Sequence, residues 1–347
     1  MKHIIGVNPP PPLPLLPQVK TVLVDEDSAG QRLDNFLLRH LKGVPKTHVY
    51  RIIRSGEVRV NKGRASADSR VATGDLVRLP PVRISERVAE KAEAMAQSIS
   101  RDAPARDFPI LFEDEHLIAI DKPSGVAVHG GSGVSFGVIE QLRMARPQAK
   151  FLELVHRLDR DTSGILLIAK KRSALTHLQD QFRERETGKT YLALVSGRWP
   201  ANKKVLDKPL HKYLLTNKDG SEGERRVKVV AKDDPNGMPS VTLVKVRNTS
   251  ASSFTLLEVT IKTGRTHQIR VHLASEGFPI AGDDKYGDFD LNKTLLRAGK
   301  LPALKRMFLH AWRLQFNHPA SGERIELTAN LPPELDTFAT HAAPAAT

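Results

Sequence analysis

The stretch that decides the fold reads HRLDRDTSGILLIAK and occupies residues 156–170. Its first nine residues, 156–164, are mostly polar or charged, and they lead directly into the apolar run of residues 165–169. A buried strand holds the loop before it firmly, so the polar side chains of such a loop can converge on a ligand. An aspartate between arginines is also typical of a plain ion-pair network. The rest of the chain has to separate these two interpretations.

The segments around this loop predict the fold class. Apolar, strand-like runs occur at residues 117–120, 191–195, 241–246 and 254–261, and helical patterns occur at 174–186 and 267–275. Strands and helices do not alternate regularly, which argues against a parallel, doubly wound sheet. We therefore expect an α+β domain over residues 108–338, built on a mixed, largely antiparallel β-sheet.

A smaller domain is predicted at residues 19–82. Apolar residues at helical spacing indicate two short helices, and strand-like runs precede and follow them. Arg32-Leu33-Asp34 and the segment GEVRVN at residues 56–61, together with this order of elements, resemble the S4 RNA-binding module. A generic basic α+β domain with a solvated charged face is the alternative. The candidate RNA contacts are its basic residues Arg32, Lys46, Arg51, Arg54, Arg59 and Lys62.

Three segments are predicted to lie outside the two domains. Residues 1–18 are proline-rich, which blocks a helix and favours a disordered tail. Residues 83–107 are charged and alanine-rich and indicate a linker. Residues 339–347 are mostly small and are expected to form a second disordered tail.

The charge balance of the chain favours a polyanionic partner. Its 347 residues include 53 Lys and Arg against 39 Asp and Glu, a net charge of +14. Nucleic acid is the commonest partner of so basic a protein, although some proteins are basic without one. Cysteine is absent, which excludes disulfides, thiolate zinc sites and cysteine nucleophiles. We find neither a signal-peptide pattern nor an apolar run of about 18 residues, so we expect a cytoplasmic protein without membrane contact.

Five further motifs accompany the 156–164 loop in a fixed order. They read DKPSGVAVH at residues 121–129, KTYLALV at 189–195, TGRTHQIRVH at 263–272, GDDKYG at 282–287 and FLHA at 308–311. Together the six resemble the family of pseudouridine synthases that contains the large-subunit ribosomal RNA enzymes A, C and D. The resemblance implies isomerisation of uridine in RNA without a cofactor. It also implies large-subunit ribosomal RNA, naked or in a pre-ribosomal particle, as the partner. We expect a monomer.

The resemblance assigns the central site residues. It implies that Asp159 is the catalytic group, that Arg270 is its cationic partner and that Tyr191 stacks on the target base. A carboxylate can act as nucleophile or base without a cofactor, and a neighbouring cation favours its ionised form. Attack on C1′, addition at C6 and proton abstraction leading to a glycal all stay open as routes. For Tyr191 a purely structural role at the start of a strand is the alternative.

Four more residues complete the candidate substrate site. Arg157 matches the family residue that enters the space left by the flipped base, and its planar guanidinium can stack and hydrogen-bond at once. His156 is expected to order the loop, and Thr162 belongs to the same loop. Arg265 follows a glycine that permits a tight turn, and it is positioned to meet phosphate.

Two other classes of function were weighed. An S4-type ribosome assembly factor with an inert enzyme domain would not need the intact 156–164 loop. A metal- or nucleotide-dependent RNA enzyme is disfavoured because the chain has no GxxxxGK[ST] or GxGxxG motif. The pairs His267 and His272, and His310 and His318, also lack the spacing of a metal site. We therefore predict that no metal is bound.

Overall fold

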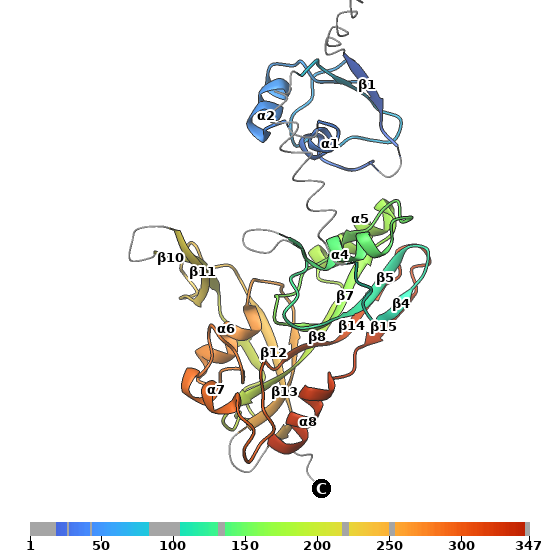
Figure 1. Cartoon of the computed structure of the whole chain (residues 1–347). Coiled ribbons are helices and arrows are strands. Elements are labelled where there is room, and N and C mark those ends of the chain that lie inside the picture. Colours follow the sequence, from blue (N-terminus) through green and yellow to red (C-terminus); the bar gives the residue numbers. More distant parts are fainter. Residues whose placement is uncertain are drawn as a thin grey trace, which may run out of the picture. The chain divides into compact units, whose positions relative to one another are not determined.

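The computed structural model describes residues 19–25, 28–41, 44–82, 105–130, 136–216, 222–249 and 254–343 (Figure 1). The chain divides into two units, residues 1–101 and 102–347. The predicted tail at residues 1–18 and residues 83–104 of the predicted linker lie outside the described part. Each unit has its own core and is described by itself.

The first unit is a three-stranded antiparallel sheet with two helices. Its elements are β1 (Lys20–Leu23), α1 (Leu33–His40), α2 (Lys46–Arg54), β2 (Arg59–Val60) and β3 (Leu76–Leu79), and the strand order is β1-β3-β2. Apolar residues three and four apart lie on the inner face of each helix, as the sequence predicted. The core they form contains Leu33, Phe36 and Leu37 of α1, Val49, Ile52 and Ile53 of α2, and Val77 and Leu79 of β3.

The second unit is built on one ten-stranded sheet. Eight strands follow the path β4 (Ile110–Glu113), β5 (Leu117–Lys122), β7 (Ser163–Ala169), β14 (Leu309–Asn317), β8 (Gly188–Ser196), β13 (Phe254–Ile261), β12 (Val241–Thr249) and β9 (Val205–Asp207). β15 (Arg324–Thr328) pairs with β14, and β6 (Glu153–Leu154) pairs with β7. β14 runs parallel to β7, and every other pairing described in this sheet is antiparallel. The expected α+β fold with a mixed, largely antiparallel sheet is confirmed.

Helices cover both faces of the first half of this sheet. Along β5 and β7, successive side chains point to opposite faces, and both faces are buried. α5 (Arg172–Glu184) packs on one face through Ala174, Leu175 and Leu178. α4 (Val138–Ala145) packs on the other face through Val138 and its neighbours. Burial on both sides explains why β7 reads as an unbroken apolar run.

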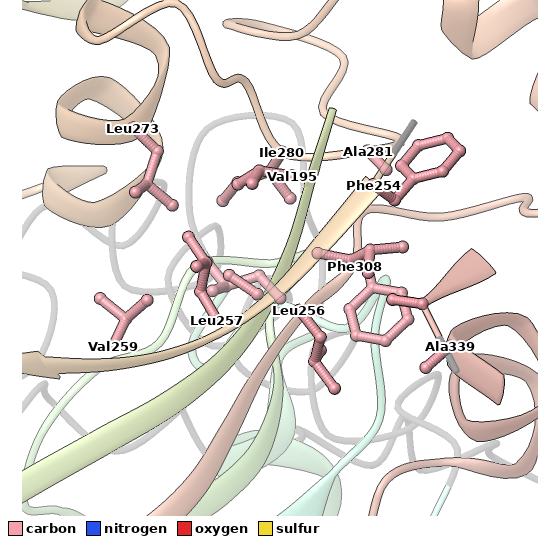
Figure 2. Close-up of a cluster of buried hydrophobic side chains, with 14 of the residues drawn as sticks. Val195, Phe254, Leu256, Leu257, Val259, Leu273, Ile280, Ala281, Phe308 and Ala339 are labelled. Atoms are coloured by element: carbon pink, nitrogen blue, oxygen red, sulfur yellow. The ribbon is translucent and has the colours of Figure 1, made fainter. Parts of the chain in front are cut away.

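The second half of the sheet carries the largest core cluster (Figure 2). Leu257 and Val259 of β13 lie there beside Leu273 of α6 (Gln268–Ser275) and Phe308, which precedes β14. α7 (Phe289–Leu295) adds Leu295 to the same cluster. β10 (Leu210–Thr216) and β11 (Glu222–Val229) form a separate antiparallel hairpin beside this half.

The C-terminal boundary of the second domain, predicted at residue 338, lies later than predicted. α8 (Pro333–Ala342) continues through the residues expected to form a disordered tail, and Ala339, Ala342 and Ala343 are buried in the largest cluster. Alanines carry little hydrophobic signal, but their small side chains let a helix pack closely against a core. The tail prediction is therefore wrong for residues 339–343, and residues 344–347 lie outside the described part.

Candidate active site

Asp159 lies in the loop between β6 and β7, at the boundary of two adjoining cavities. A turn closes this loop, because the backbone N–H of Thr162 donates to the carbonyl oxygen of Asp159 at 3.2 Å. The Asp159 side chain is 28% exposed. It lines a small cavity of about 90 Å³ and a wider groove of about 650 Å³. The carboxylate is therefore both held by the fold and open to a ligand.

The glycine that ends the loop is required by close packing. Gly164 has φ +110°, and a Cβ on it would lie 2.3 Å from the carbonyl oxygen of Ala311 on β14. The parallel pairing of β7 with β14 begins here, with Ser163 opposite His310 and Gly164 opposite Ala311. A side chain at this position would separate the two strands on which the loop rests.

A buried lysine ties the loop to the strand behind it. Lys122, at the end of β5, is fully buried, and its Nζ donates to the carbonyl oxygens of Pro123, Val126 and Arg160 at 2.8–3.0 Å. Three acceptors match the three protons of an ammonium group. Burial lowers the pKa of Lys122 to about 7, against the attraction of nearby carboxylates such as Asp161. The 121–129 motif thus anchors the 156–164 loop from within the domain.

His156 anchors the other end of the loop and does not line either cavity at Asp159. Its Nε2 accepts a hydrogen bond from the backbone N–H of Leu167 at 3.1 Å, and its ring stacks on Phe182 of α5 with centroids 4.7 Å apart. Burial lowers the pKa of His156 to about 3, helped by the charge of Lys189. This neutral, packed imidazole is placed to order the loop, and the structure does not bring it to the substrate side.

Arg270 of α6 lies between the carboxylates of Asp283 and Asp159, and its Nη2 also donates to Asp284 at 3.2 Å. It is 2% exposed and makes a bidentate pair with the buried Asp283, at 2.8 and 2.6 Å. On its other side, Nη1 lies 3.7 Å from Oδ2 of Asp159. Burial acts to lower the pKa of Arg270, but the hydrogen bonds and charge of Asp283 outweigh it, and the pKa rises. Arg270 is thus a fixed, permanent cation beside Asp159.

The loop before α6 is held by a glutamine. The Oε1 of Gln268 accepts hydrogen bonds from the Thr263 hydroxyl at 2.8 Å and the Arg265 backbone N–H at 3.1 Å. Its Nε2 donates to Val241 and Thr242 of β12. This network fixes the turn that carries Arg265, a partly exposed residue that lines both cavities.

His267 also belongs to this site, although the sequence pattern had suggested it only as a possible metal ligand. It lines both cavities, and its Nε2 lies 3.9 Å from Oδ2 of Asp159. Its backbone adopts the left-handed conformation, with φ 53° and ψ 20°, at the residue before α6. Burial lowers the pKa of His267, against the attraction of Asp159. Its place inside the TGRTHQIRVH motif was the available signal.

The remaining predicted catalytic-domain residues also gather here. Tyr191 of β8, Arg157 and Thr162 line the small cavity together with Asp159. Burial raises the pKa of Tyr191, and the charge of Asp159 raises it further, so the phenol stays protonated at neutral pH. Arg157 is exposed and also lines the wider groove, whereas Thr162 is buried.

The predicted RNA-binding residues of the small domain differ in their exposure and in their ion pairs. Lys46, Arg51, Arg54 and Lys62 are exposed and Arg59 is partly exposed. Arg32 is already ion-paired within the domain, because it donates two hydrogen bonds to the buried Asp34, at 3.2 and 2.8 Å. Lys62 has φ 67° in the tight turn after β2, a conformation that is uncommon for a lysine.

Two negative findings concern the described residues. Among them no group of three or more His, Asp or Glu residues is arranged to hold a metal ion. The helices formed by these residues include none that is both apolar and long enough to span a membrane.

Comparisons with known proteins agree with this arrangement. Residues 116–275 match the family model described as RNA pseudouridylate synthase, and residues 31–77 match the S4 domain. Ribosomal large subunit pseudouridine synthase C of Escherichia coli (strain K12) is 51% identical over 313 residues, 90% of this chain and 93% of that protein. The protein of the same name from Haemophilus influenzae (strain ATCC 51907 / DSM 11121 / KW20 / Rd) is 52% identical over 313 residues, 90% of this chain and 92% of its own.

A solved structure gives the same result for the fold. Human RNA Pseudouridylate Synthase Domain Containing 4 is 26% identical, with a TM-score of 0.53, over 73% of this chain and 97% of the human one. The alignment with the Escherichia coli synthase, in which 51% of the residues are identical, spans 90% of this chain and so includes both the S4 match and the synthase match. The chain belongs to the family of RNA pseudouridine synthases and carries an S4 domain before its synthase domain.

Proposed function

We propose that this chain converts specific uridines of large-subunit ribosomal RNA to pseudouridine, without a cofactor and with Asp159 as the catalytic group. The names of its half-identical relatives support the substrate. The observation that carries the assignment of the residue is the position of Asp159. It is a partly exposed carboxylate at a cavity, 3.7 Å from a buried arginine whose other side is already paired.

This geometry supports catalysis by a carboxylate. Reaction requires that the bond between C1′ and N1 break and that C5 of the uracil join C1′. A carboxylate can attack a carbon or accept a proton in such a sequence. Arg270 attracts and orients Asp159 with one side of its guanidinium, while Asp283 holds the other side. The catalytic group is then preorganised before any substrate arrives.

A folded RNA must give up its target base to reach this cavity. Flipping a nucleotide costs a few kcal/mol, which contacts in the pocket have to offset. Tyr191 offers an aromatic face, and stacking on such a face contributes about 1–3 kcal/mol per base. Arg157 is exposed at the edge of the cavity, and we assign to it the space that the flipped base leaves in the RNA.

The S4 domain has a separate task in this proposal. Its exposed cations on α2 and in the turn after β2 contact phosphates and set the position of the RNA, while the large domain performs the chemistry. Affinity for RNA should then fall steeply as salt rises. The substrate is ribosomal RNA, naked or in a pre-ribosomal particle, and the protein acts as a cytoplasmic monomer.

The direct test measures tritium release from large-subunit ribosomal RNA labelled at C5 of uridine and isolated from cells that lack the enzyme. We expect release by the wild type in the presence of a chelator, and no release by Asp159→Ala. Retained RNA binding by this variant would show that the loss concerns chemistry. An active Asp159→Ala enzyme would refute the catalytic assignment.

A further inference from the structure

We propose that His267 is a second catalytic residue, whose Nε2–H donates a hydrogen bond to a uracil carbonyl oxygen as negative charge develops on the base. The inference rests on the proposed function, because it assigns a role within the same reaction. Three observations carry it: the direction of the hydrogen bonds around the imidazole, the position of its free nitrogen, and its backbone conformation.

Hydrogen bonds around Tyr286 favour one tautomer of His267. The backbone N–H of Val227 donates to the Tyr286 hydroxyl oxygen at 3.0 Å. The hydroxyl keeps its own proton, and Nδ1 of His267, at 2.9 Å, is positioned to accept it. This arrangement favours Nδ1 as the acceptor, and the proton of a neutral imidazole then sits on Nε2.

The Nε2–H group of His267 lines the cavity at Asp159, and no hydrogen-bond partner is seen for it in the described part of the chain. It lies 3.9 Å from Oδ2 of Asp159, whereas an N–H···O hydrogen bond spans about 2.7–3.2 Å. Two other buried histidines of this domain differ. His272 engages Thr242 and Lys208 through its two ring nitrogens, and His310 engages Ser163 and Ala329. The Nε2–H group of His267 is thus available to donate a hydrogen bond to a substrate beside the Asp159 carboxylate.

The backbone at His267 has an uncommon conformation for a residue other than glycine. It is left-handed, with φ 53° and ψ 20°. Conformations of this kind persist where the surrounding structure imposes them, and they are concentrated at functional sites. The conformation therefore supports a functional role for His267, whose ring lies beside Asp159.

The charged groups around the imidazole favour a neutral donor. Burial is the main cause that lowers the pKa of His267; Arg270 and Lys285 lower it further, while Asp159 and Asp283 act against them. A neutral imidazole can donate its hydrogen bond without transferring the proton. It also leaves the negative charge of Asp159 undiminished.

The step that His267 assists is breakage of the glycosidic bond. The electron pair of the C1′–N1 bond stays on uracil, where it is shared between N1 and the carbonyl oxygens. According to the route, the Asp159 carboxylate bonds to C1′, adds to C6 of the base, or removes a proton from C2′ so that a C1′=C2′ double bond forms. A fixed N–H donor at a carbonyl oxygen binds the charged base more strongly than the neutral nucleotide, so it raises kcat more than it lowers KM.

The experiment compares His267→Asn with His267→Gln in the tritium-release assay, with the wild type alongside. Asparagine suits the left-handed backbone but ends near the Nδ1 position, whereas glutamine carries an N–H to about the reach of Nε2. We expect His267→Asn to lose about 100- to 1,000-fold in kcat with KM changed less than about threefold. His267→Gln should recover at least about tenfold of that loss.

Tyr286→Phe tests the tautomer independently. It removes the proton that Nδ1 accepts, so Nδ1 can take the imidazole proton and leave Nε2 without one. We expect a loss of about tenfold in kcat, and no further loss when Tyr286→Phe is added to His267→Asn. Wild-type kcat in His267→Asn, or a loss confined to KM, would overturn the inference. A wild type that releases no tritium from unmodified RNA would instead refute the proposed function.

Discussion

Two loops of the catalytic domain bring a carboxylate to the same arginine, and they do so differently. In the 282–287 loop, Asp283 is fully buried and makes two short hydrogen bonds to Arg270. In the 156–164 loop, Asp159 is partly exposed and lies 3.7 Å from the same guanidinium. Asp283 also accepts backbone hydrogen bonds from Lys285 and Tyr286, while Asp159 faces the two cavities.

The difference between the two carboxylates indicates separate roles: Asp283 stabilises the structure of the site, and Asp159 is available for its chemistry. A buried ion pair is stable only when its hydrogen bonds are satisfied, and Asp283 satisfies those of Arg270. Arg270 can then present a fixed charge to Asp159 without binding it tightly. The first carboxylate stabilises the structure, and the second stays available for the substrate. Four predictions test this division, from the largest effect to the smallest.

The largest effect should come from Asp159→Asn. We expect a loss of activity on the order of 10⁴-fold, because an amide can neither attack carbon nor accept a proton as a carboxylate does. The free energy of unfolding should change by less than about 1 kcal/mol, since the lost contact is long and partly exposed. Tritium release and urea unfolding measure the two quantities. If Asp159→Asn were strongly destabilised, Asp159 would stabilise the structure as Asp283 does, and the proposed division of roles would be wrong.

Asp283→Asn should show the opposite pattern. Loss of the charge of Asp283 removes the buried partner of Arg270 and leaves it only the more exposed Asp159 and Asp284, so we expect destabilisation by about 3–5 kcal/mol. Urea unfolding followed by circular dichroism measures this change. If Asp283→Asn unfolds at the same urea concentration as the wild type, the proposed anchoring role of Asp283 is wrong.

Acid should remove the contribution of Asp283 to the free energy of unfolding. Burial acts to raise the pKa of Asp283, but the Arg270 guanidinium outweighs it, and the folded-state pKa lies below the ordinary value of 3.8. The unfolded chain therefore takes up the proton first as pH falls. The stability difference between the wild type and Asp283→Asn should be constant above about pH 5 and shrink below it. Unfolding curves at a series of acidic pH values measure this trend.

Asp284→Asn should have the smallest effect. Asp284 lies 3.2 Å from Arg270, but its side chain is 61% exposed. Exposed ion pairs contribute less than about 1 kcal/mol, so stability should fall by no more than that. This variant is the matched control for Asp283→Asn, because it removes a neighbouring charge from the same arginine. Equal destabilisation by both variants would show that charge, and not burial, decides the effect.

Local patterns in the sequence predicted much of the fold. Helical spacing in the small domain gave α1 and α2, and apolar runs gave β5, β7 and β13, because these signals depend on neighbouring residues. The anchoring of the catalytic loop was not predictable in this way. The hydrogen bond from Lys122 to the carbonyl oxygen of Arg160 and the pairing of Gly164 with Ala311 join segments about 40 and 150 residues apart. Such contacts arise only in the folded chain.

The candidate site was predicted by resemblance, and its geometry required the structure. The motifs placed Asp159, Arg270 and Tyr191 in one site, and these residues do line one cavity. The role of Asp283 had no signal, because two adjacent acidic residues in a GDDKYG turn are equally compatible with a solvated loop. Nor does a single histidine in a motif reveal a left-handed backbone or a hydrogen bond between its Nδ1 and a tyrosine hydroxyl.

The position of β14 in the sheet has a consequence for synthesis of the chain. β14 joins β7 on one side and β8 on the other, yet it is formed by residues 309–317, near the C-terminal end of the sequence. Asp159 precedes β7, while Tyr191 lies on β8. Until the ribosome has released β14, the two halves of the sheet lack their shared strand and expose unpaired edges. A nascent chain therefore acquires its active site only after residues 309–317 have been synthesised, and truncations that remove β14 should leave an inert, aggregation-prone protein.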